Sequence, residues 1–515
     1  FEPEIEDYAR LLAGCMHQMA VREGAEYTAF VDFCVNILQQ HSKLITEGDE
    51  LNFDSPNQCQ ELLYLKLGLP VRIRSKVQRG SFRDKERLPG SPATNDKAMQ
   101  TAIAEDCPNG DWRREFLRTL LDVKAAATRI ELYWDPYPLW RRPDTGMVHG
   151  QIKNNGTVTR RPTGSQPNLL QVSKGPVRRM VEPRYKNISI GGRYNRHVTV
   201  SIDFSGQELR ITGSEAKDPS FIEAYTGGGT YVDEYGMTRQ RVKDVHSVTG
   251  CMFALEVLRR ELDEPLLGVL EMDEFGKMSY FQFRSIVEDG VLALSQLSLS
   301  EDDAGKVVKA VNGVRKMAKA VNFLICYLGQ PSTLAGNIGI PKAFAERIMA
   351  AVFASYARLA PWQAEMIALA RKQGFVTTAY GNWKHVSPDI LAKDGGKRSR
   401  AERQAVNQIV QGCAADILKI VLTQSERQGI FSNPHKAVMY APVYDEVLSS
   451  VHMDYCFEYV EKMQDIMNLT PPGHAIPMMG EVSVGMNWCD QVELGDRPAE
   501  RKLTELFDKW VKEAA

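Results

Sequence analysis

The 515-residue sequence lacks the motifs of several large enzyme and binding classes. Its nine cysteines form no Cys-x-x-Cys pair, which argues against a zinc site or a disulfide framework and fits a reducing compartment. A Gly-x-x-x-x-Gly-Lys-Ser/Thr phosphate loop, a His-Glu-x-x-His zinc motif and a Gly-x-Ser-x-Gly nucleophile elbow are all absent. Apolar runs stay shorter than the roughly 18 residues of a membrane helix, so we expect no membrane span.

A strong charge of one sign is also missing, because 63 Lys and Arg nearly balance 65 Asp and Glu, for a net charge of −2. This excludes a protein that coats nucleic acid through bulk charge, but it leaves room for a local basic groove. Basic residues gather at 72–87 and at 174–196. Each run fits either a solvated face or a surface that meets phosphates.

The chain length predicts two or more domains or large subdomains. The chain begins with Phe rather than Met, so we expect a fragment or processed product with an upstream domain missing. Apolar periodicity predicts helices over 2–46, 110–133 and 401–426, a mostly helical 215–395, and an amphipathic helix in the tail from 497. Alternation predicts a half-buried strand over 198–204, and 437–443 and 447–451 read as a hairpin.

Carboxylates stand at the ends of the predicted strands. Asp203 lies near the end of the first strand, and Asp445 and Glu446 lie at the tip of the hairpin. Hard cations prefer oxygen ligands, and two Mg²⁺ ions about 3.5–4 Å apart activate a hydroxyl and stabilise a leaving oxygen. The alternative is that these acids are ordinary turn residues.

Four residues spaced by four fall on one face of a predicted helix: Arg315, Lys319, Phe323 and Tyr327. Two cations followed by two aromatic rings suit a nucleoside triphosphate, since the cations meet phosphates and the rings meet base or sugar. The alternative is a surface helix whose long cations lie along the edge of a core.

A second polar helix face carries Arg403, Asn407 and Gln411, followed by Gly412. Polar side chains with small residues behind them suit contacts with sugar, base edges and phosphate. An ordinary solvated helix face is the alternative.

Taken together, these segments resemble the motifs of the DNA polymerase I family (family A). Ser201-Ile-Asp-Phe-Ser-Gly-Gln-Glu-Leu-Arg210 resembles motif A, the helix Arg315 to Tyr327 resembles motif B, and Val443-Tyr-Asp-Glu-Val447 resembles motif C. Thr157 to Leu169 and Glu402 to Gly412 are similar to two further family segments, and 51–58 and 88–94 resemble parts of the thumb. Five motifs appear in family order between 157 and 447.

The resemblance implies two-metal phosphoryl transfer to a primer 3′ end, with two Mg²⁺ as cofactors and Mn²⁺ able to substitute. Asp203 and Asp445 would hold the metals, Glu446 would support the catalytic site, and Lys319 would act on the triphosphate. For the deoxynucleoside triphosphate, the resemblance implies the binding residues Arg315, Lys319, His246, Phe323, Tyr327 and Glu208, with Glu208 excluding a 2′ hydroxyl. For primer–template DNA it implies Arg161, Asn168, Arg403, Asn407, Gln411 and Tyr444.

The expected fold is α+β, the right hand of this family. A helical thumb would cover 1–130, an antiparallel-sheet palm 131–212 and 397–515, and helical fingers 213–396. The stretch 255–303 holds twelve acids and four bases, and we expect it to be a fingers insertion that faces solvent or a protein partner. This divergence indicates a bacteriophage replication enzyme, located in the cytoplasm of the host cell, with no membrane association.

Three departures from the family pattern stand near the expected site. Tyr444 replaces the usual His of motif C, and Leu324 and Leu328 replace glycines of motif B. Two rival functions remain open at this stage. A non-catalytic DNA-binding or replisome scaffold is disfavoured by the intact Asp203, Asp445 and Lys319, and a single-subunit RNA polymerase is disfavoured by Glu208.

Overall fold

The computed structural model describes residues 56–74, 91–108, 110–233, 236, 238–240, 243–295, 299–338 and 340–514. The chain divides into two compact units, Phe1–His149 and Gly150–Ala515. This division falls at 149/150, whereas the sequence places the end of the thumb at 130. The helix expected over 2–46 and most of the basic run 72–87 lie outside the described residues.

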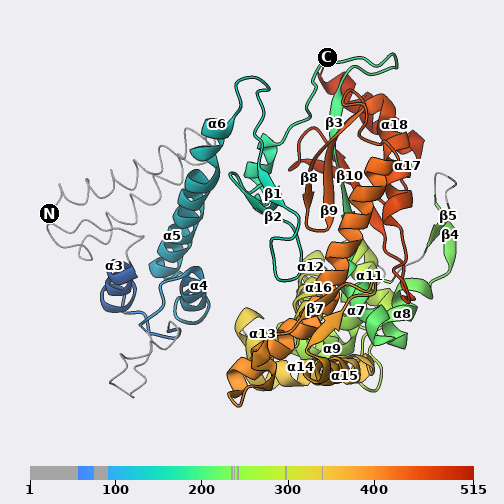
Figure 1. Cartoon of the computed structure of the whole chain (residues 1–515). Coiled ribbons are helices and arrows are strands. Elements are labelled where there is room, and N and C mark those ends of the chain that lie inside the picture. Colours follow the sequence, from blue (N-terminus) through green and yellow to red (C-terminus); the bar gives the residue numbers. More distant parts are fainter. Residues whose placement is uncertain are drawn as a thin grey trace, which may run out of the picture. The chain divides into compact units, whose positions relative to one another are not determined.

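The first unit is helical in its described part (Figure 1). Its elements are α3 (Pro56–Gln60), the π-helix η2 (Glu61–Lys66), α4 (Asp96–Glu105), α5 (Trp112–Arg129), the π-helix η3 (Ile130–Trp134) and α6 (Pro136–Trp140). Asn95 and Asp111 cap α4 and α5, because each side chain accepts a hydrogen bond from a backbone N–H of the first turn. The helix expected over 110–133 is therefore confirmed.

A five-stranded antiparallel sheet forms the centre of the second unit, in the order β11-β10-β3-β9-β8 (Figure 1). The strands are β3 (His197–Phe204), β8 (Ala437–Val443), β9 (Glu446–His452), β10 (Gly480–Gly485) and β11 (Gln491–Gly495). The register places Asp203 of β3 between Glu446 of β9 and Glu481 of β10. The three expected strands are confirmed, and β10 and β11 complete the sheet.

The strand β3 is more buried than its alternating sequence predicts. Its apolar residues are fully buried, but Thr199 and Ser201 on the opposite face are also buried. The polar face is covered because Gln491 of β11 accepts a hydrogen bond from Ser201 Oγ at 2.7 Å. Asp203 is the single exposed residue of the strand. The prediction of a half-buried strand was therefore wrong, and Asp203 alone reaches solvent.

Helices surround the sheet and form a second mass below it in Figure 1. The first are α7 (Gln207–Ala216), α8 (Pro219–Thr226), α9 (Val245–Glu261), α10 (Glu264–Leu267), α11 (Tyr280–Asp289) and α12 (Glu301–Cys326). They are followed by α13 (Pro331–Ile338), α14 (Lys342–Ser355), α15 (Leu359–Gln373), α16 (Gly395–Arg427), α17 (Cys456–Met467) and α18 (Glu500–Ala514). Short strand pairs and 3₁₀ turns join them: β1 (Gln151–Lys153), β2 (Thr163–Ser165), β4 (Thr230–Val232), β5 (Thr238–Gln240), β6 (Phe375–Thr377), β7 (Trp383–His385), η4 (Leu169–Gln171), η5 (Pro176–Met180), η6 (Gly290–Leu294), η7 (Pro388–Leu391) and η8 (Met453–Tyr455).

The long helix α16 joins the two masses, since it runs from the lower helices up beside the sheet (Figure 1). Among the described residues it is the one helix long and apolar enough to cross a membrane. However, 72% of its most apolar window is buried inside the protein. That burial is the property of a core helix, so its hydrophobicity is explained by packing.

The acidic stretch 255–303 is built partly into the helical core. Phe283 and Ile286 of α11 are fully buried, whereas the acids of the stretch are mostly exposed. The charged side chains of this stretch face solvent as expected. Its buried apolar residues do not, because they pack with α9 and α12 in the core. Gly250 of α9 permits this approach, since a Cβ there would lie 2.9 Å from Phe283 Cζ.

The end of α12 explains one of the departures from the family pattern. Gly329 N–H donates to Leu324 O at 2.8 Å and Leu328 N–H donates to Ile325 O at 3.3 Å, the bond pair of a Schellman cap. Leu328 has φ +54, in the left-handed position that such a cap normally gives to glycine. The chain therefore keeps the glycine-type turn with a leucine, and the Leu328 side chain packs against the core.

The β8–β9 hairpin turns through the two residues Tyr444 and Asp445. Tyr444 has φ +59, and Asp445 does not share this sign. A two-residue turn with a positive φ at its first position is of type II′, which favours glycine there. The turn holds Tyr444 in a conformation that costs about 1–2 kcal/mol for a residue with a side chain.

We predict that Phe283→Ala lowers the free energy of unfolding by about 3–5 kcal/mol, because a fully buried ring leaves a cavity under α9. The matched control is Phe281→Ala, two residues earlier on the same helix, where the ring is 83% exposed and the free energy of unfolding should change by less than about 0.5 kcal/mol. Urea unfolding of the two variants measures the difference. Equal effects would contradict the burial of α11 in the core.

We also predict that Tyr444→Gly is more stable than Tyr444→Ala by about 1 kcal/mol, because only glycine is unstrained at a positive φ. At Val438, which pairs with Ser450 inside β8, the order should reverse, since glycine weakens a regular strand. Urea unfolding midpoints of the four variants test this. A Gly variant less stable than its Ala counterpart at position 444 would argue against the type II′ turn.

Candidate functional site

Three carboxylates meet where β3 ends and the β8–β9 hairpin turns. Phe204 N–H donates to Asp445 O at 3.1 Å, which holds the hairpin turn against the end of β3. Asp203 faces Glu446 across the antiparallel pair. Trp488 Nε1 donates to Glu446 Oε1 at 2.7 Å, which fixes that carboxylate. The structure thus brings Asp203 together with Asp445 and Glu446, which follow it by 242 and 243 residues in the sequence.

Burial, together with neighbouring charges, controls the protonation of this cluster. Loss of hydration, reinforced by the negative charges of Asp445, Glu446 and Glu481, raises the pKa of Asp203 to about 8. Loss of hydration likewise raises the pKa of Asp445, although the positive charges of Arg161 and Lys174 act in the opposite direction. Asp203 therefore holds its proton near pH 7, because the cations close to the cluster do not offset burial and the neighbouring acids.

Two residues at this cluster had no individual role in the sequence interpretation. Glu481 reaches it through β10, a strand that was not predicted, and it pairs with Asp203 in the register. Lys174 was part of the general basic run 174–196, but its charge acts on both Asp203 and Asp445. Lys174 stands two residues before the basic 3₁₀ turn η5, and the sequence indicated its charge but not the two aspartates on which that charge acts.

The cluster suits a divalent cation. Asp203 and Asp445 offer carboxylate oxygens at one solvent-accessible point, and a cation there would offset the burial and the neighbouring negative charges that raise the pKa of Asp203. No group of three or more His, Cys, Asp or Glu side chains placed to hold a metal is found in the described part of the chain. Mg²⁺ is commonly held by one or two carboxylates, with water and substrate oxygens as its other ligands.

Glu208 lies close to the cluster, in the first turn of α7. Its carboxylate forms a short ion pair with Arg161 Nη2, and Gln411 of α16 also bonds to it. Burial raises the pKa of Glu208 despite these two partners. The structure therefore joins one residue expected at the sugar with two expected on DNA, a connection that their spacing in sequence does not predict.

The helix α12 presents the expected triphosphate-binding face. Arg315 Nε donates to Asp244 Oδ2 at 2.7 Å, and Lys319 is exposed one turn later without an acidic partner among the described residues. Phe323, another turn on, keeps 38% of its surface exposed. Tyr327 follows the last residue of the helix as its cap, and its hydroxyl is buried without a hydrogen-bond partner in the described part.

His246 joins this face from the first turn of α9. Burial, assisted by the charges of Arg315 and Lys319, lowers the pKa of His246 to about 4, so the ring is neutral near pH 7. Asn322 Nδ2 lies 3.0 Å from His246 Nδ1. Since the amide donates, Nδ1 accepts and the proton sits on Nε2. His246 is therefore a neutral donor, and its ring centroid lies 6.2 Å from that of Phe323.

The remaining expected DNA-binding residues take different positions. On α16, Arg403 bonds to Ser399 Oγ at 2.6 Å, and Asn407 Oδ1 is buried without a hydrogen-bond partner among the described residues. Asn168 caps η4, since its Oδ1 accepts from Leu170 N–H at 3.2 Å. The Tyr444 ring lies 6.0 Å from the guanidinium carbon of Arg161. Arg161, Gln411 and Tyr444 thus adjoin the carboxylate cluster, whereas Asn168 has a local structural role.

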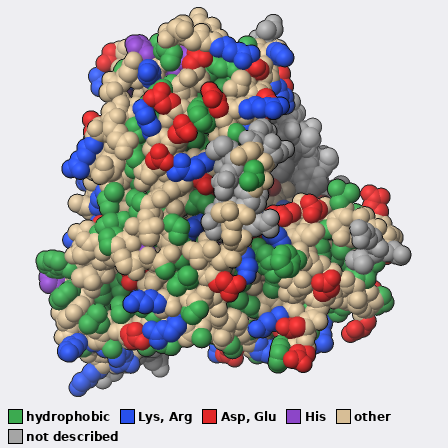
Figure 2. Space-filling view, turned by 90° about the vertical axis from the view of Figure 1, so that its right-hand side faces the viewer, with side chains coloured by type: hydrophobic (Ala, Val, Ile, Leu, Met, Phe, Trp, Pro, Cys, Tyr) green, Lys and Arg blue, Asp and Glu red, His purple; other side chains and the backbone are tan. Residues whose placement is uncertain are grey.

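Charges of both signs are interspersed on the face drawn in Figure 2. Basic and acidic side chains alternate there, which agrees with the balanced composition of the chain. A broad electrostatic field of one sign does not mark this face. Recognition of an anionic partner must therefore come from local groups such as those on α12 and α16.

The family model of "DNA polymerase family A" matches residues 28–256 and 303–490, which is more than half of the chain. DNA polymerase I of Pseudomonas aeruginosa is 25% identical over 444 residues, covering 86% of this chain and 38% of the relative. The thermostable DNA polymerase I of Thermus aquaticus is 23% identical over 451 residues, covering 87% of this chain and 42% of the relative. The chain thus spans about two fifths of the length of these relatives.

A solved structure shares the fold: the POL domain of Pol1 from M. smegmatis, in complex with DNA primer-template and dNTP. Its TM-score is 0.63 at 20% sequence identity, covering 92% of this chain and 66% of that chain. This likeness confirms the expected right-hand α+β fold. The match of the family model on both sides of 257–302 shows that the chain belongs to DNA polymerase family A.

Proposed function

We propose that this chain catalyses template-directed DNA synthesis, adding deoxynucleotides to a primer 3′ end by two-metal phosphoryl transfer. The observation that carries the proposal is the meeting of Asp203 and Asp445 at the end of β3, where both carboxylates reach solvent. The chain's membership of DNA polymerase family A supports the same conclusion. Asp203 and Asp445 would hold two Mg²⁺, and Glu446, fixed by Trp488, would keep the hairpin turn in register with β3.

The bound cations would lower the pKa of the primer 3′ hydroxyl and offset charge on the leaving pyrophosphate. The chain itself supplies positioning and fixed charge. Lys319 and Arg315 would bind phosphate oxygens, and His246 would donate a hydrogen bond from Nε2 without adding charge. Phe323, with an exposed ring one turn after Lys319, would stack on the base and sugar of the nucleotide.

Glu208 would select deoxyribose. Its side chain is held by Arg161 and Gln411 and lies near Asp445, so it cannot move away from a 2′ hydroxyl without losing both partners. A fixed carboxylate under the sugar leaves no space for an added hydroxyl, and a hydroxyl forced into that position would also lose its hydration. This makes the Arg161–Glu208 pair part of sugar selection.

Primer–template DNA would lie along α16. The buried Oδ1 of Asn407 has no hydrogen-bond partner among the described residues, and buried polar atoms are normally paired. A base edge or sugar in the minor groove would pair it, with Arg403 on a phosphate and Tyr444 beside the primer end. Asn168 would support this surface as a cap of η4.

The acidic stretch 255–303 is our candidate for a contact with another protein. Phe275, Phe281 and Leu292 in this stretch are each 78% or more exposed. Large exposed apolar side chains among acids fit a partner that carries basic and apolar groups. By relation to DNA polymerase I enzymes, we infer a cytoplasmic location, which is the host cytoplasm for an enzyme of phage origin.

The test is extension of a labelled primer on a template, with dNTPs or rNTPs and with or without Mg²⁺. The proposal expects extension with dNTPs only, and only with metal. Extension that persists with rNTPs alone would favour an RNA polymerase. Tight DNA binding without extension would favour a scaffold.

We predict that Asp203→Ala and Asp445→Ala each lower the extension rate by about 10³-fold or more, because removal of a metal ligand removes a large electrostatic term. Primer–template affinity should change less than threefold. Glu493→Ala is the matched control, since this acid is exposed on β11, and it should extend normally. Rapid-quench extension and filter binding measure both quantities. If either Asp variant extended the primer at the parent rate, that aspartate would not be an essential metal ligand.

We predict that Glu208→Ala raises ribonucleotide incorporation relative to deoxynucleotide incorporation by about 10- to 100-fold. The reason is that the carboxylate no longer occupies the space beneath the sugar. Glu215→Ala is the control, since Glu215 lies on the same helix and pairs with His474 instead. The kcat/KM ratio for rATP and dATP gives the selectivity. An unchanged ratio in Glu208→Ala would place the sugar filter elsewhere.

A further inference from the structure

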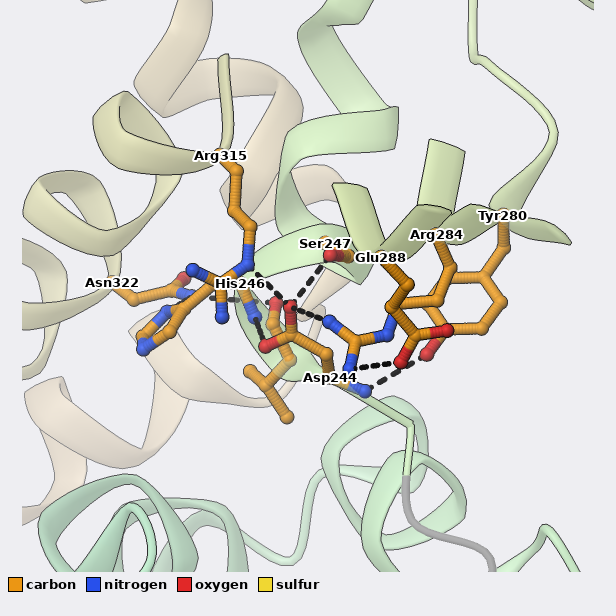
Figure 3. Close-up of polar contacts among 9 residues, drawn as sticks. Asp244, His246, Ser247, Tyr280, Arg284, Glu288, Arg315 and Asn322 are labelled. Carbon is orange, nitrogen blue, oxygen red and sulfur yellow. Dashed lines mark hydrogen bonds and ion pairs between the residues drawn. The ribbon is translucent and has the colours of Figure 1, made fainter. Parts of the chain in front are cut away.

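The match of the family model omits residues 257–302, and this insertion reaches into the expected triphosphate site. Asp244, which precedes α9, connects the two. Its Oδ2 accepts from Arg315 Nε at 2.7 Å and from Ser247 Oγ at 2.6 Å, and its Oδ1 accepts from His246 N–H at 3.2 Å (Figure 3). Asp244 therefore fixes Arg315 and the start of the turn that carries His246.

Two side chains from the insertion approach the same residue. Arg284 Nη1 of α11 lies 3.3 Å from Asp244 Oδ2, and Asp244 N–H donates to the hydroxyl of Tyr280 at 2.9 Å. The second terminal nitrogen of Arg284 pairs with Glu288 Oε1 at 2.5 Å, which sets the plane of its guanidinium (Figure 3). Arg284 of α11 and Arg315 of α12 thus approach the same carboxylate oxygen, Asp244 Oδ2, from two different helices.

The insertion is anchored well enough to set this geometry. Phe283, the residue before Arg284, is fully buried against α9 at Gly250. Met278 N–H donates to Cys251 O at 3.1 Å, so the strand-like segment before α11 is also bonded to α9. A side chain on such a support loses little further freedom when it binds a charged partner.

Arg315 binds Asp244 in a way that leaves its own terminal nitrogens available to a substrate. It donates through Nε, and its two terminal nitrogens donate to no residue in the described part of the chain. Burial favours a raised pKa at Asp244, but the hydrogen bonds from Arg315 and Ser247 outweigh it and lower that pKa, so the carboxylate stays ionised. A second cation on this carboxylate reduces its pull on the terminal nitrogens of Arg315.

We propose that Arg284 of the insertion is a positioning residue for the incoming triphosphate, because it shares Asp244 with Arg315 and leaves the terminal nitrogens of Arg315 available to phosphate oxygens. Without Arg284, Arg315 turns to bind Asp244 through Nε and a terminal nitrogen together, since guanidinium and carboxylate favour that bidentate pair. The terminal nitrogen is then lost to the triphosphate. This inference rests on the proposed polymerase function.

The test measures nucleotide affinity with the full chain in two ways: calorimetric binding of dATP with Mg²⁺ in the absence of DNA, and the dATP KM in primer extension. We expect Arg284→Ala to weaken both by about 3- to 10-fold, with kcat, primer–template affinity and melting temperature unchanged. Arg284→Lys should recover part of the loss, because one ammonium still reaches Asp244. Arg347→Ala is the matched control, since Arg347 pairs with Glu256 at 3.1 Å elsewhere in the same helical mass.

The double variant decides whether Arg284 acts through Arg315. In an Arg315→Ala background, Arg284→Ala should cause no further loss of dATP affinity. A full additional loss would overturn the positioning role, because Arg284 would then bind the triphosphate itself. Parent-like dATP affinity in Arg284→Ala would also overturn it. Failure of the parent to bind dATP or to extend a primer would instead reject the proposed function.

Discussion

Repulsion among carboxylates at the end of β3 is the constraint on which the rest of the site depends. Asp203, Asp445 and Glu446 are brought together by an antiparallel register that also adds Glu481. Such a cluster is stable only with compensation, and the fold supplies some through Arg161 and Lys174 and through the Trp488 bond to Glu446. At the solvent-accessible end of β3 this compensation is incomplete, and this is the point at which we propose that a divalent cation binds.

The other charged groups of the site are arranged around the same constraint. Lys319 of α12 is exposed, in the position that we propose for phosphate binding, and ion pairs hold the charged side chains close to it. Asp244 holds Arg315, and Glu208 is itself held by Arg161. The acidic insertion, which looks unsuited to a DNA polymerase, contributes a cation to this arrangement through Arg284, while its acids stay at the surface.

Much of the fold and site could be predicted from local sequence. Strand alternation and the hairpin pattern placed Asp203 and Asp445 at strand ends, and spacing by four placed Arg315, Lys319 and Phe323 on one helix face, whereas their expected roles came from the family resemblance. The pairs between distant residues could not be predicted, because no local pattern encodes them: Arg161 meets Glu208 from 47 residues away and Arg315 meets Asp244 from 71. The burial of β3 on its polar face was missed for the same reason, since Gln491 covers it from 290 residues away.

The most direct test of the carboxylate cluster is proton release on Mg²⁺ binding, measured by calorimetry in two buffers of different ionisation enthalpy. With the pKa of Asp203 near 8, the account predicts release of up to about one proton at pH 7, falling toward zero by about pH 9. The Asp203→Asn variant should release none. Mg²⁺ binding at pH 7 without proton release, or equal release by Asp203→Asn, would contradict the account.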